Sequence, residues 1–159
     1  MPRLVLSTPL GDVALQLLAD AAPATAAHVA RLARAGVYDG ASFYRSDFVI
    51  QMGLHGTTAA LPPSFPPLTV NESARAGHLS NVRGAAALAH WDVPDCGGTE
   101  LFISLKANAH LDAAYGGFCV FAAVAAGDAA SFATIDAIAK AVAGGAKPVV
   151  TAAEIVSHA

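Results

Sequence analysis

Residues 43–53 read FYRSDFVIQMG and set a single arginine among aromatic and β-branched residues. These neighbours predict two short strands, and Ser46-Asp47 predicts the bend between them. An arginine keeps its charge at any physiological pH and is almost never fully buried without a partner. Arg45 is therefore expected either to face solvent on the wet side of a strand or to have a specific function.

On either side of this stretch, the order of apolar and turn residues predicts a mainly β chain. One helix is expected within 20–36, where Pro23 suits the first turn and Gly36 the C-terminal cap, and a second within 128–145, with Ser131 as candidate N-cap. Strands are expected at 3–7, 12–18, 41–46, 48–55, 84–91, 100–105, 118–124 and 148–158, and an extended loop at 56–70. About eight strands and two widely separated helices favour a β-barrel plugged by helices over alternating βαβ units.

The bulk properties restrict the class of protein. A chain of 159 residues fits a single domain, 1–159, that is large enough to bury its own core. A net charge of -3 with nine scattered basic residues disfavours a nucleic-acid partner. No stretch approaches the roughly 20 apolar residues of a membrane span, and the amino terminus lacks a signal-peptide pattern. We therefore expect a soluble, cytoplasmic protein without a membrane partner.

Cysteine and histidine spacing gives no support for redox or metal chemistry. Cys96 and Cys119 form no C-x-x-C motif and suit a reducing compartment as small hydrophobes, although an incidental disulfide stays open as an alternative. The six histidines show no H-x-x-x-H or H-E-x-x-H spacing, so no metal site is expected. Nucleophile-elbow and phosphate-loop patterns are also missing.

Several blocks of the sequence resemble the cyclophilin family of peptidyl-prolyl isomerases, in the family's order and over nearly the whole chain. They are GVYDGASFYR, FVIQMG, RGAAALAH, TELFISL, HLDAAYGGFCVFAAV and KPVVTAAEIV. The resemblance implies a closed eight-stranded antiparallel β-barrel with a helix over each end. It also implies an enzyme without a cofactor that acts on proline-containing peptides and on unfolded or loop segments of proteins.

The resemblance also implies the site residues. Arg45 matches the family's catalytic arginine, and Phe48 and Gln51 match a pocket phenylalanine and a glutamine beside it. The implied substrate-binding positions are Val49, Ala89, His90, Glu100, Phe102, His110, Leu111 and Phe118.

This set of residues suits the chemistry of prolyl isomerisation. Rotation about an X-Pro bond must break amide resonance, at a barrier of about 18–20 kcal/mol, but no covalent bond is made or cleaved. The catalyst has only to bind the twisted imide better than either planar form. A guanidinium can donate to the lone pair that twisting frees on the prolyl nitrogen, and an apolar pocket can hold the ring still. The alternative is a module that binds proline-containing segments as an adaptor, with little or no turnover.

Some positions depart from the family pattern. Only Ser46 and Asp47 separate Arg45 from Phe48, where the family usually has four residues. Glu100 stands in place of a glutamine and Asp47 also lies close, so the groove is expected to carry negative charge that pairs with Arg45 and weakens its donation.

Three further replacements change the expected pocket. His90 replaces an asparagine and Phe118 a histidine. His110 replaces the tryptophan that contributes much of the binding of cyclosporin in many members, so cyclosporin binding is expected to be weak.

Phe48 and Gln51 lie three residues apart, so both can reach one groove only if the chain bends at or just before Phe48. Without coiled-coil heptads, a monomer is the default expectation.

Overall fold

The computed structural model describes residues 2–55, 65, 67–74, 79–90 and 97–157. Its strands are β1 (Arg3–Thr8), β2 (Gly11–Leu17), β3 (Ser42–Ser46), β4 (Val49–Gly53), β5 (Ala85–Leu88), β6 (Leu101–Ser104), β7 (Val120–Ala123) and β8 (Ala152–Val156). Two α-helices, α1 (Pro23–Arg34) and α2 (Ala129–Ala143), and three short 3-10 turns, η1 (Glu72–Ala74), η2 (Ala109–Asp112) and η3 (Ala114–Gly116), complete the described elements. The predicted class, mainly β with two helices, is confirmed. Most of the loop predicted at 56–70 lies outside the described residues, as do Trp91 and Cys96.

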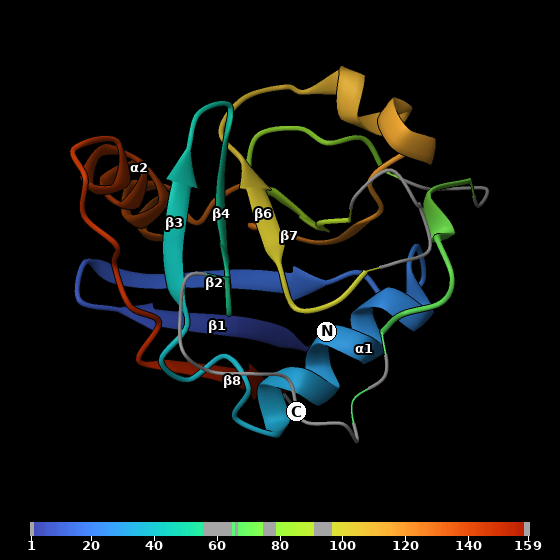
Figure 1. Cartoon of the computed structure of the whole chain (residues 1–159), viewed down its shortest axis with the longest axis horizontal. Coiled ribbons are helices and arrows are strands. Elements are labelled where there is room, and N and C mark those ends of the chain that lie inside the picture. The colour runs from blue at the N-terminus through green and yellow to red at the C-terminus, as the bar shows by residue number, and fades with distance from the viewer. Residues whose placement is uncertain (1, 56–64, 66, 75–78, 91–96, 158–159) are drawn as a thin grey trace.

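The eight strands form one antiparallel sheet in the order β3-β4-β6-β5-β7-β2-β1-β8. In Figure 1, β3, β4 and β6 stand upright while β1, β2 and β8 run across, so the sheet curls into a half-barrel. The expected closure of the barrel is wrong, because the sheet is open between its edge strands β3 and β8. In the described part of the chain, a single bridge, Ser42 to Val149, spans this gap. The neighbouring Pro148 accepts a hydrogen bond from the amide of Phe43 but has no N–H to extend a ladder.

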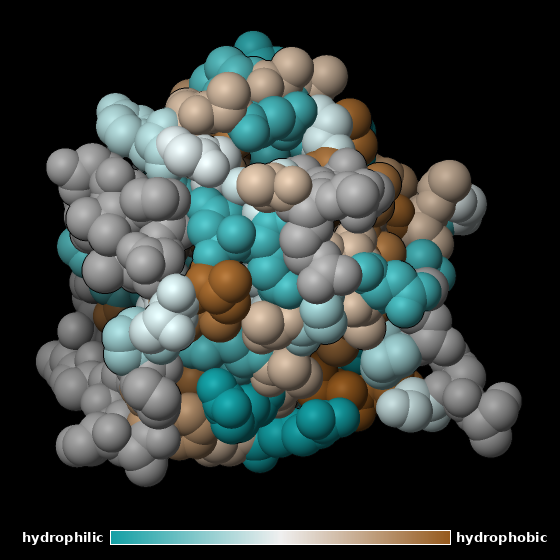
Figure 2. Space-filling model, turned by 90° about the vertical axis from the view of Figure 1, so that its right-hand side faces the viewer, coloured by the Kyte–Doolittle hydropathy of each residue, from teal (hydrophilic) through white to brown (hydrophobic). Residues whose placement is uncertain are grey.

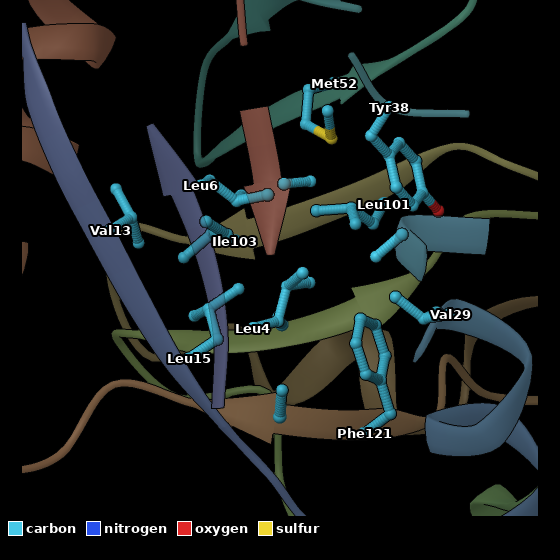
Figure 3. Packing of buried hydrophobic residues seen from close by; sticks show 14 of the residues in the cluster. Leu4, Leu6, Val13, Leu15, Val29, Tyr38, Met52, Leu101, Ile103 and Phe121 are labelled. Atoms are coloured by element: carbon cyan, nitrogen blue, oxygen red, sulfur yellow. The ribbon is translucent and has the colours of Figure 1, made fainter. Parts of the chain in front are cut away.

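Alternating residues of the strands fill the concave side of the sheet. Figure 3 shows Leu4 and Leu6 of β1 meeting Ile103 of β6 and the ring of Phe121. These side chains are fully buried, and each such aliphatic or aromatic residue contributes about 1.5–3 kcal/mol to stability. The period-2 pattern of the sequence therefore sets which side of each strand packs inward.

The helices cover the open ends of the curled sheet (Figure 1): α1 packs on β7 and β8, and α2 on β2, β3 and β4. Helix α1 ends at Arg34 with Ala35 as C-cap, one residue before the predicted cap Gly36, whose φ of 75° allows the amides of Gly36 and Val37 to reach back to the last turn. The N-cap predicted for α2 is wrong. Asp128 is the cap and accepts from the amide of Ser131, which lies inside the first turn and donates its hydroxyl to the same carboxylate.

The convex side of the sheet carries a second apolar cluster, separate from the core. Its buried members are Val49, Ala87, Phe102, Leu111 and Phe118. Elsewhere the surface is mixed, and the described residues on the face in Figure 2 show hydrophobic and hydrophilic side chains interspersed. Within the described ranges, no helix is long and apolar enough to cross a bilayer.

Candidate active site

A β-bulge between β3 and β4 explains the direction in which Arg45 points. Phe43 pairs with Met52 and Arg45 pairs with Gln51, so Tyr44 is an extra residue on β3. Under regular alternation, Phe43 and Arg45 would share a face. Because of the bulge, Phe43 is fully buried in the core while the Arg45 side chain is 42% exposed on the convex side.

The bend predicted at or just before Phe48 is also confirmed. The chain reverses at Asp47 and Phe48, between the last residue of β3 and the first residue of β4. Asp47 stabilises this turn by accepting a hydrogen bond from the amide of Val49 at 3.1 Å. The side-chain amide of Asn108 donates to the carbonyl of Phe48 at 3.0 Å and ties the turn to the loop that precedes η2. Phe48 and Gln51 can therefore line the same groove.

The groove lies over the convex face and brings together every predicted site residue except His110. Its predicted members are Arg45, Phe48, Val49, Gln51, Ala89, His90, Glu100, Phe102, Leu111 and Phe118. His110 is not among the lining residues, but its ring meets the ring of Phe48 edge-on, with centroids 5.1 Å apart. His110 is therefore an exposed neighbour of Phe48 and is not one of the residues that line the groove.

The floor of the groove is apolar and aromatic. Phe102 and Phe118 are 4% and 8% exposed and meet edge-to-face at 5.5 Å between ring centroids. His90 stacks on Phe118 at 4.3 Å and bonds through Nε2 to the carbonyl of Gly117 at 2.9 Å, which fixes its ring. Leu111 completes this floor, which can hold a small apolar ring but offers it few hydrogen bonds.

Arg45 stands at the edge of this floor with two of its nitrogens engaged. Its Nε donates to Asp47 at 2.8 Å, and its Nη1 donates to the side-chain oxygen of Gln51 at 3.0 Å. Its guanidinium carbon lies 5.3 Å from the centroid of the Phe48 ring. Within the described part of the chain, Nη2 has no hydrogen-bond partner, so its two N–H groups can donate to a ligand.

Of the two carboxylates expected to pair with Arg45, Asp47 does so at 2.8 Å, whereas Glu100 forms no hydrogen bond or ion pair with Arg45 in the described part of the chain. The Glu100 carboxylate accepts hydrogen bonds from the amides of Leu54 and His55, at 3.2 and 2.9 Å, from the hydroxyl of Tyr44 at 3.1 Å and from the hydroxyl of Thr99. Gly53 makes room for it, because a Cβ there would lie 2.3 Å from the carboxylate. The negative charge of Glu100 is thus held by four donors at one end of the groove.

Tyr44 lines the groove but is not among the predicted site residues. Its ring is half-buried, and both burial and the charge of Glu100 raise the pKa of its hydroxyl to about 12, so it stays protonated. Regular alternation from the buried Phe43 already places Tyr44 on the groove side, and the bulge brings Arg45 to the same side. The other lining residues that were not predicted are Leu54, His55, Gly98, Thr99 and Tyr115.

Two buried side chains hold the 98–100 segment from behind. The hydroxyl of Tyr38 donates to the carbonyl of Thr99 at 2.9 Å, and His28 Nε2 bonds to the carbonyl of Gly98 at 2.8 Å. Burial lowers the pKa of His28 and raises that of Tyr38, so both groups are neutral near pH 7. These two contacts fix the backbone from which Glu100 reaches Tyr44.

No metal centre is formed by the side chains that the structure describes, since they contain no group of three or more histidine, cysteine, aspartate or glutamate residues at metal-binding distance. Cys119 is buried beneath the groove, next to the hydroxyl of Thr25. The site is thus an apolar groove with the guanidinium of Arg45 at its edge and the hydrogen-bonded carboxylate of Glu100 at one end.

A curled antiparallel sheet with such a groove on its convex face defines the class of cyclophilin folds, and comparisons with known proteins agree. The family model for "Cyclophilin type peptidyl-prolyl cis-trans isomerase/CLD" matches residues 3–159. The chain therefore belongs to this family, and its enzyme class is peptidyl-prolyl cis-trans isomerase.

Individual relatives support the same assignment. A peptidyl-prolyl cis-trans isomerase of Synechococcus elongatus is 33% identical over 115 residues, covering 70% of this chain and 74% of the relative. CYP18-1 of Arabidopsis thaliana is 30% identical over 112 residues, covering 69% of each. A cyclophilin-type isomerase of Cryptosporidium parvum, crystallised in the presence of the dipeptide Ala-Pro, superposes with a TM-score of 0.80 over 98% of this chain and 99% of its own, at 18% identity.

Proposed function

We propose that the groove binds a proline-containing segment and that Arg45 accelerates rotation about its X-Pro bond. The observation that carries this proposal is the exposed guanidinium, which has unused donors and stands beside a buried apolar floor. The proline ring would rest on Phe102, Leu111 and Phe118, and Nη2 of Arg45 would donate to the prolyl nitrogen as it becomes pyramidal. That bond strengthens only in the twisted state, so it lowers the barrier instead of merely tightening binding.

The energy required is within reach of such a site. A 10⁵-fold acceleration corresponds to about 7 kcal/mol of differential binding. The aromatic floor excludes water and so strengthens the field of the charged donor. Positioning of the peptide, which keeps the prolyl nitrogen within reach of Nη2 as the bond twists, contributes the rest of this differential binding.

A matched pair of arginines gives the test. The Arg83 side chain is 41% exposed and pairs with Asp136 at 3.0 Å, and its guanidinium carbon lies 5.0 Å from the Phe132 ring centroid. Arg83 therefore has surroundings similar to those of Arg45, with one carboxylate and one phenylalanine ring nearby, but it lies outside the groove. The exchange rate of the peptide Ala-Ala-Pro-Phe would be measured by NMR exchange spectroscopy with the native protein and with each arginine changed to alanine. We expect Arg45→Ala to lose at least tenfold in rate and Arg83→Ala to stay within twofold of the native protein. Full activity of Arg45→Ala would reject the role given to this arginine.

The ion pair between Arg45 and Asp47 favours a second candidate function, that of a binding module. A carboxylate 2.8 Å from Nε withdraws part of the positive charge from the donor face. In that case, peptide resonances would shift on titration with the native protein, but the exchange rate would stay at its uncatalysed value.

The biological role that fits the enzyme is assistance to protein folding in the cytoplasm, since prolyl isomerisation takes tens to hundreds of seconds without a catalyst. A protein whose refolding is limited by a proline should then refold faster when this enzyme is added. The Arg45→Ala variant serves as the control for nonspecific holding of the unfolded chain.

A further inference from the structure

Arg45 is joined to Glu100 by an unbroken chain of hydrogen bonds. Nη1 of Arg45 donates to the side-chain oxygen of Gln51 at 3.0 Å, and the Gln51 amide nitrogen donates to the hydroxyl of Tyr44 at 2.9 Å. The Tyr44 hydroxyl in turn donates to Oε1 of Glu100 at 3.1 Å. This chain of hydrogen bonds runs from Arg45 on β3 to Gln51 on β4, returns to the bulge in β3 at Tyr44, and ends at Glu100, the residue just before β6.

The two ends of this chain dictate its direction. A guanidinium can only donate, and an ionised carboxylate can only accept. Tyr44 must therefore give its single proton to Glu100 and accept from Gln51, which turns the oxygen of the Gln51 amide toward Arg45. If the amide were flipped, its NH₂ group would face the guanidinium donors, and Glu100 would lose the tyrosine proton. All three bonds point from the cation to the anion, so each polarises the next.

We propose that Glu100 and Tyr44 are positioning residues that fix the orientation of the Arg45 guanidinium through Gln51. The inference rests on the proposed function in that Arg45 is taken as the donor to the substrate. The Arg45 side chain is 42% exposed, and an arginine that is free at the surface samples many rotamers. One bond from Nε to Asp47 leaves the guanidinium plane free to swing, whereas a second bond from Nη1 fixes it and aims Nη2. Glu100 acts at this distance because its own place is fixed by the backbone amides of Leu54 and His55.

The variant Tyr44→Phe tests the chain, because it removes one hydroxyl and changes no charge. We expect kcat for a prolyl peptide to fall five- to tenfold while KM stays within twofold, because orientation of the donor matters most in the twisted state. The order parameter of the Arg45 Nε–H vector, measured by ¹⁵N relaxation, should fall in the same variant. Glu100→Gln should change both quantities in the same direction. The double variant should be no worse than the more severe single one, because both substitutions break the same chain.

The matched control is Thr25→Val, which likewise removes one hydroxyl that donates to a carboxylate, that of Glu72 at 2.8 Å, but lies outside the groove lining and outside the chain of hydrogen bonds. We expect it to lower the melting temperature yet to leave kcat and the Arg45 order parameter unchanged.

An Arg45 order parameter in Tyr44→Phe equal to that of the native protein would overturn the proposal, as would an unchanged kcat. Losses that multiply in the double variant would overturn it as well. If the native protein itself does not accelerate exchange, the proposed function fails, whereas a fall in the order parameter in Tyr44→Phe would still support the positioning of Arg45.

Discussion

Arg45 and Gln51 lie opposite each other in the register of β3 and β4, and the guanidinium of the first donates to the side-chain oxygen of the second at 3.0 Å. Opposite residues of an antiparallel pair share a face of the sheet, so the ladder itself aims both polar groups at the groove. This pairing exists only because the bulge at Tyr44 shifts the register by one residue. The position of the donor is thus a property of the backbone as much as of the arginine.

The small ring at position 110 predicts weak binding of cyclosporin. His110 meets the Phe48 ring at nearly a right angle but does not line the groove, and an imidazole offers less apolar area than an indole. We expect isothermal titration to give a dissociation constant above the micromolar range for the native protein and at least tenfold tighter binding for His110→Trp. Submicromolar affinity of the native protein would contradict the prediction.

Gly53 should be intolerant of a methyl group, because the group would collide with the carboxylate of Glu100 at 2.3 Å. Moving that carboxylate breaks its four hydrogen bonds, so we expect Gly53→Ala to destabilise the protein by about 1–3 kcal/mol in chemical denaturation. Gly127→Ala is the matched control, since nothing lies within 4 Å of its added Cβ. If both variants were equally stable, Glu100 would not be held as described.

Stability should fall as the pH drops below about 6.5, partly through His28. Burial lowers its pKa in the folded protein from the ordinary 6.5, so the unfolded chain binds a proton first and is favoured as the pH decreases. This contribution to stability is therefore complete above pH 7 and declines as the pH falls through 6.5 toward the lowered value. The variant His28→Gln keeps a donor for the Gly98 carbonyl but does not titrate. Denaturation at pH 8, 7, 6 and 5 should show a shallower loss for the variant, and equal slopes would argue against this assignment.

Tyr115 is expected to contribute to peptide binding in spite of a strained backbone. Its side chain is 65% exposed on the rim of the groove, and its φ of 51° lies in the left-handed region that non-glycine residues avoid. Tyr115→Gly should raise the free energy of unfolding by about 1 kcal/mol because the strain is relieved. Both Tyr115→Gly and Tyr115→Ala should bind a prolyl peptide severalfold more weakly. Unchanged affinity in both would show that the ring does not touch the ligand.

Features that depend on residues close together in the sequence could be predicted from the sequence alone. Alternating apolar residues and the Gly36 cap act within a few residues, so the strands and the end of α1 were predictable. Asp128 and Ser131 both suit an N-cap, and the sequence does not say which one the chain uses.

Features that depend on long-range pairing could not be predicted in the same way. The bulge at Tyr44 carries no glycine to mark it, and the opening beside Pro148 depends on residues a hundred positions apart. Resemblance to a family identifies the groove residues, but not the bonds from Gln51 to Tyr44 and from Tyr44 to Glu100, because Tyr44 and Glu100 differ from the family's residues.

The gap between β3 and β8 has a mechanical consequence. In the part of the chain that the structure describes, Arg45 and Ser46 have a ladder partner on the β4 side alone, and the bulged Tyr44 has no ladder partner. The half of β3 that carries Arg45 is therefore an unprotected sheet edge. It can separate from β4 at the cost of a few hydrogen bonds while the core strands stay paired. Its amide hydrogens should exchange with solvent well before those of β1 and β6. The hairpin that carries Arg45 can thus move while the rest of the sheet keeps its pairing.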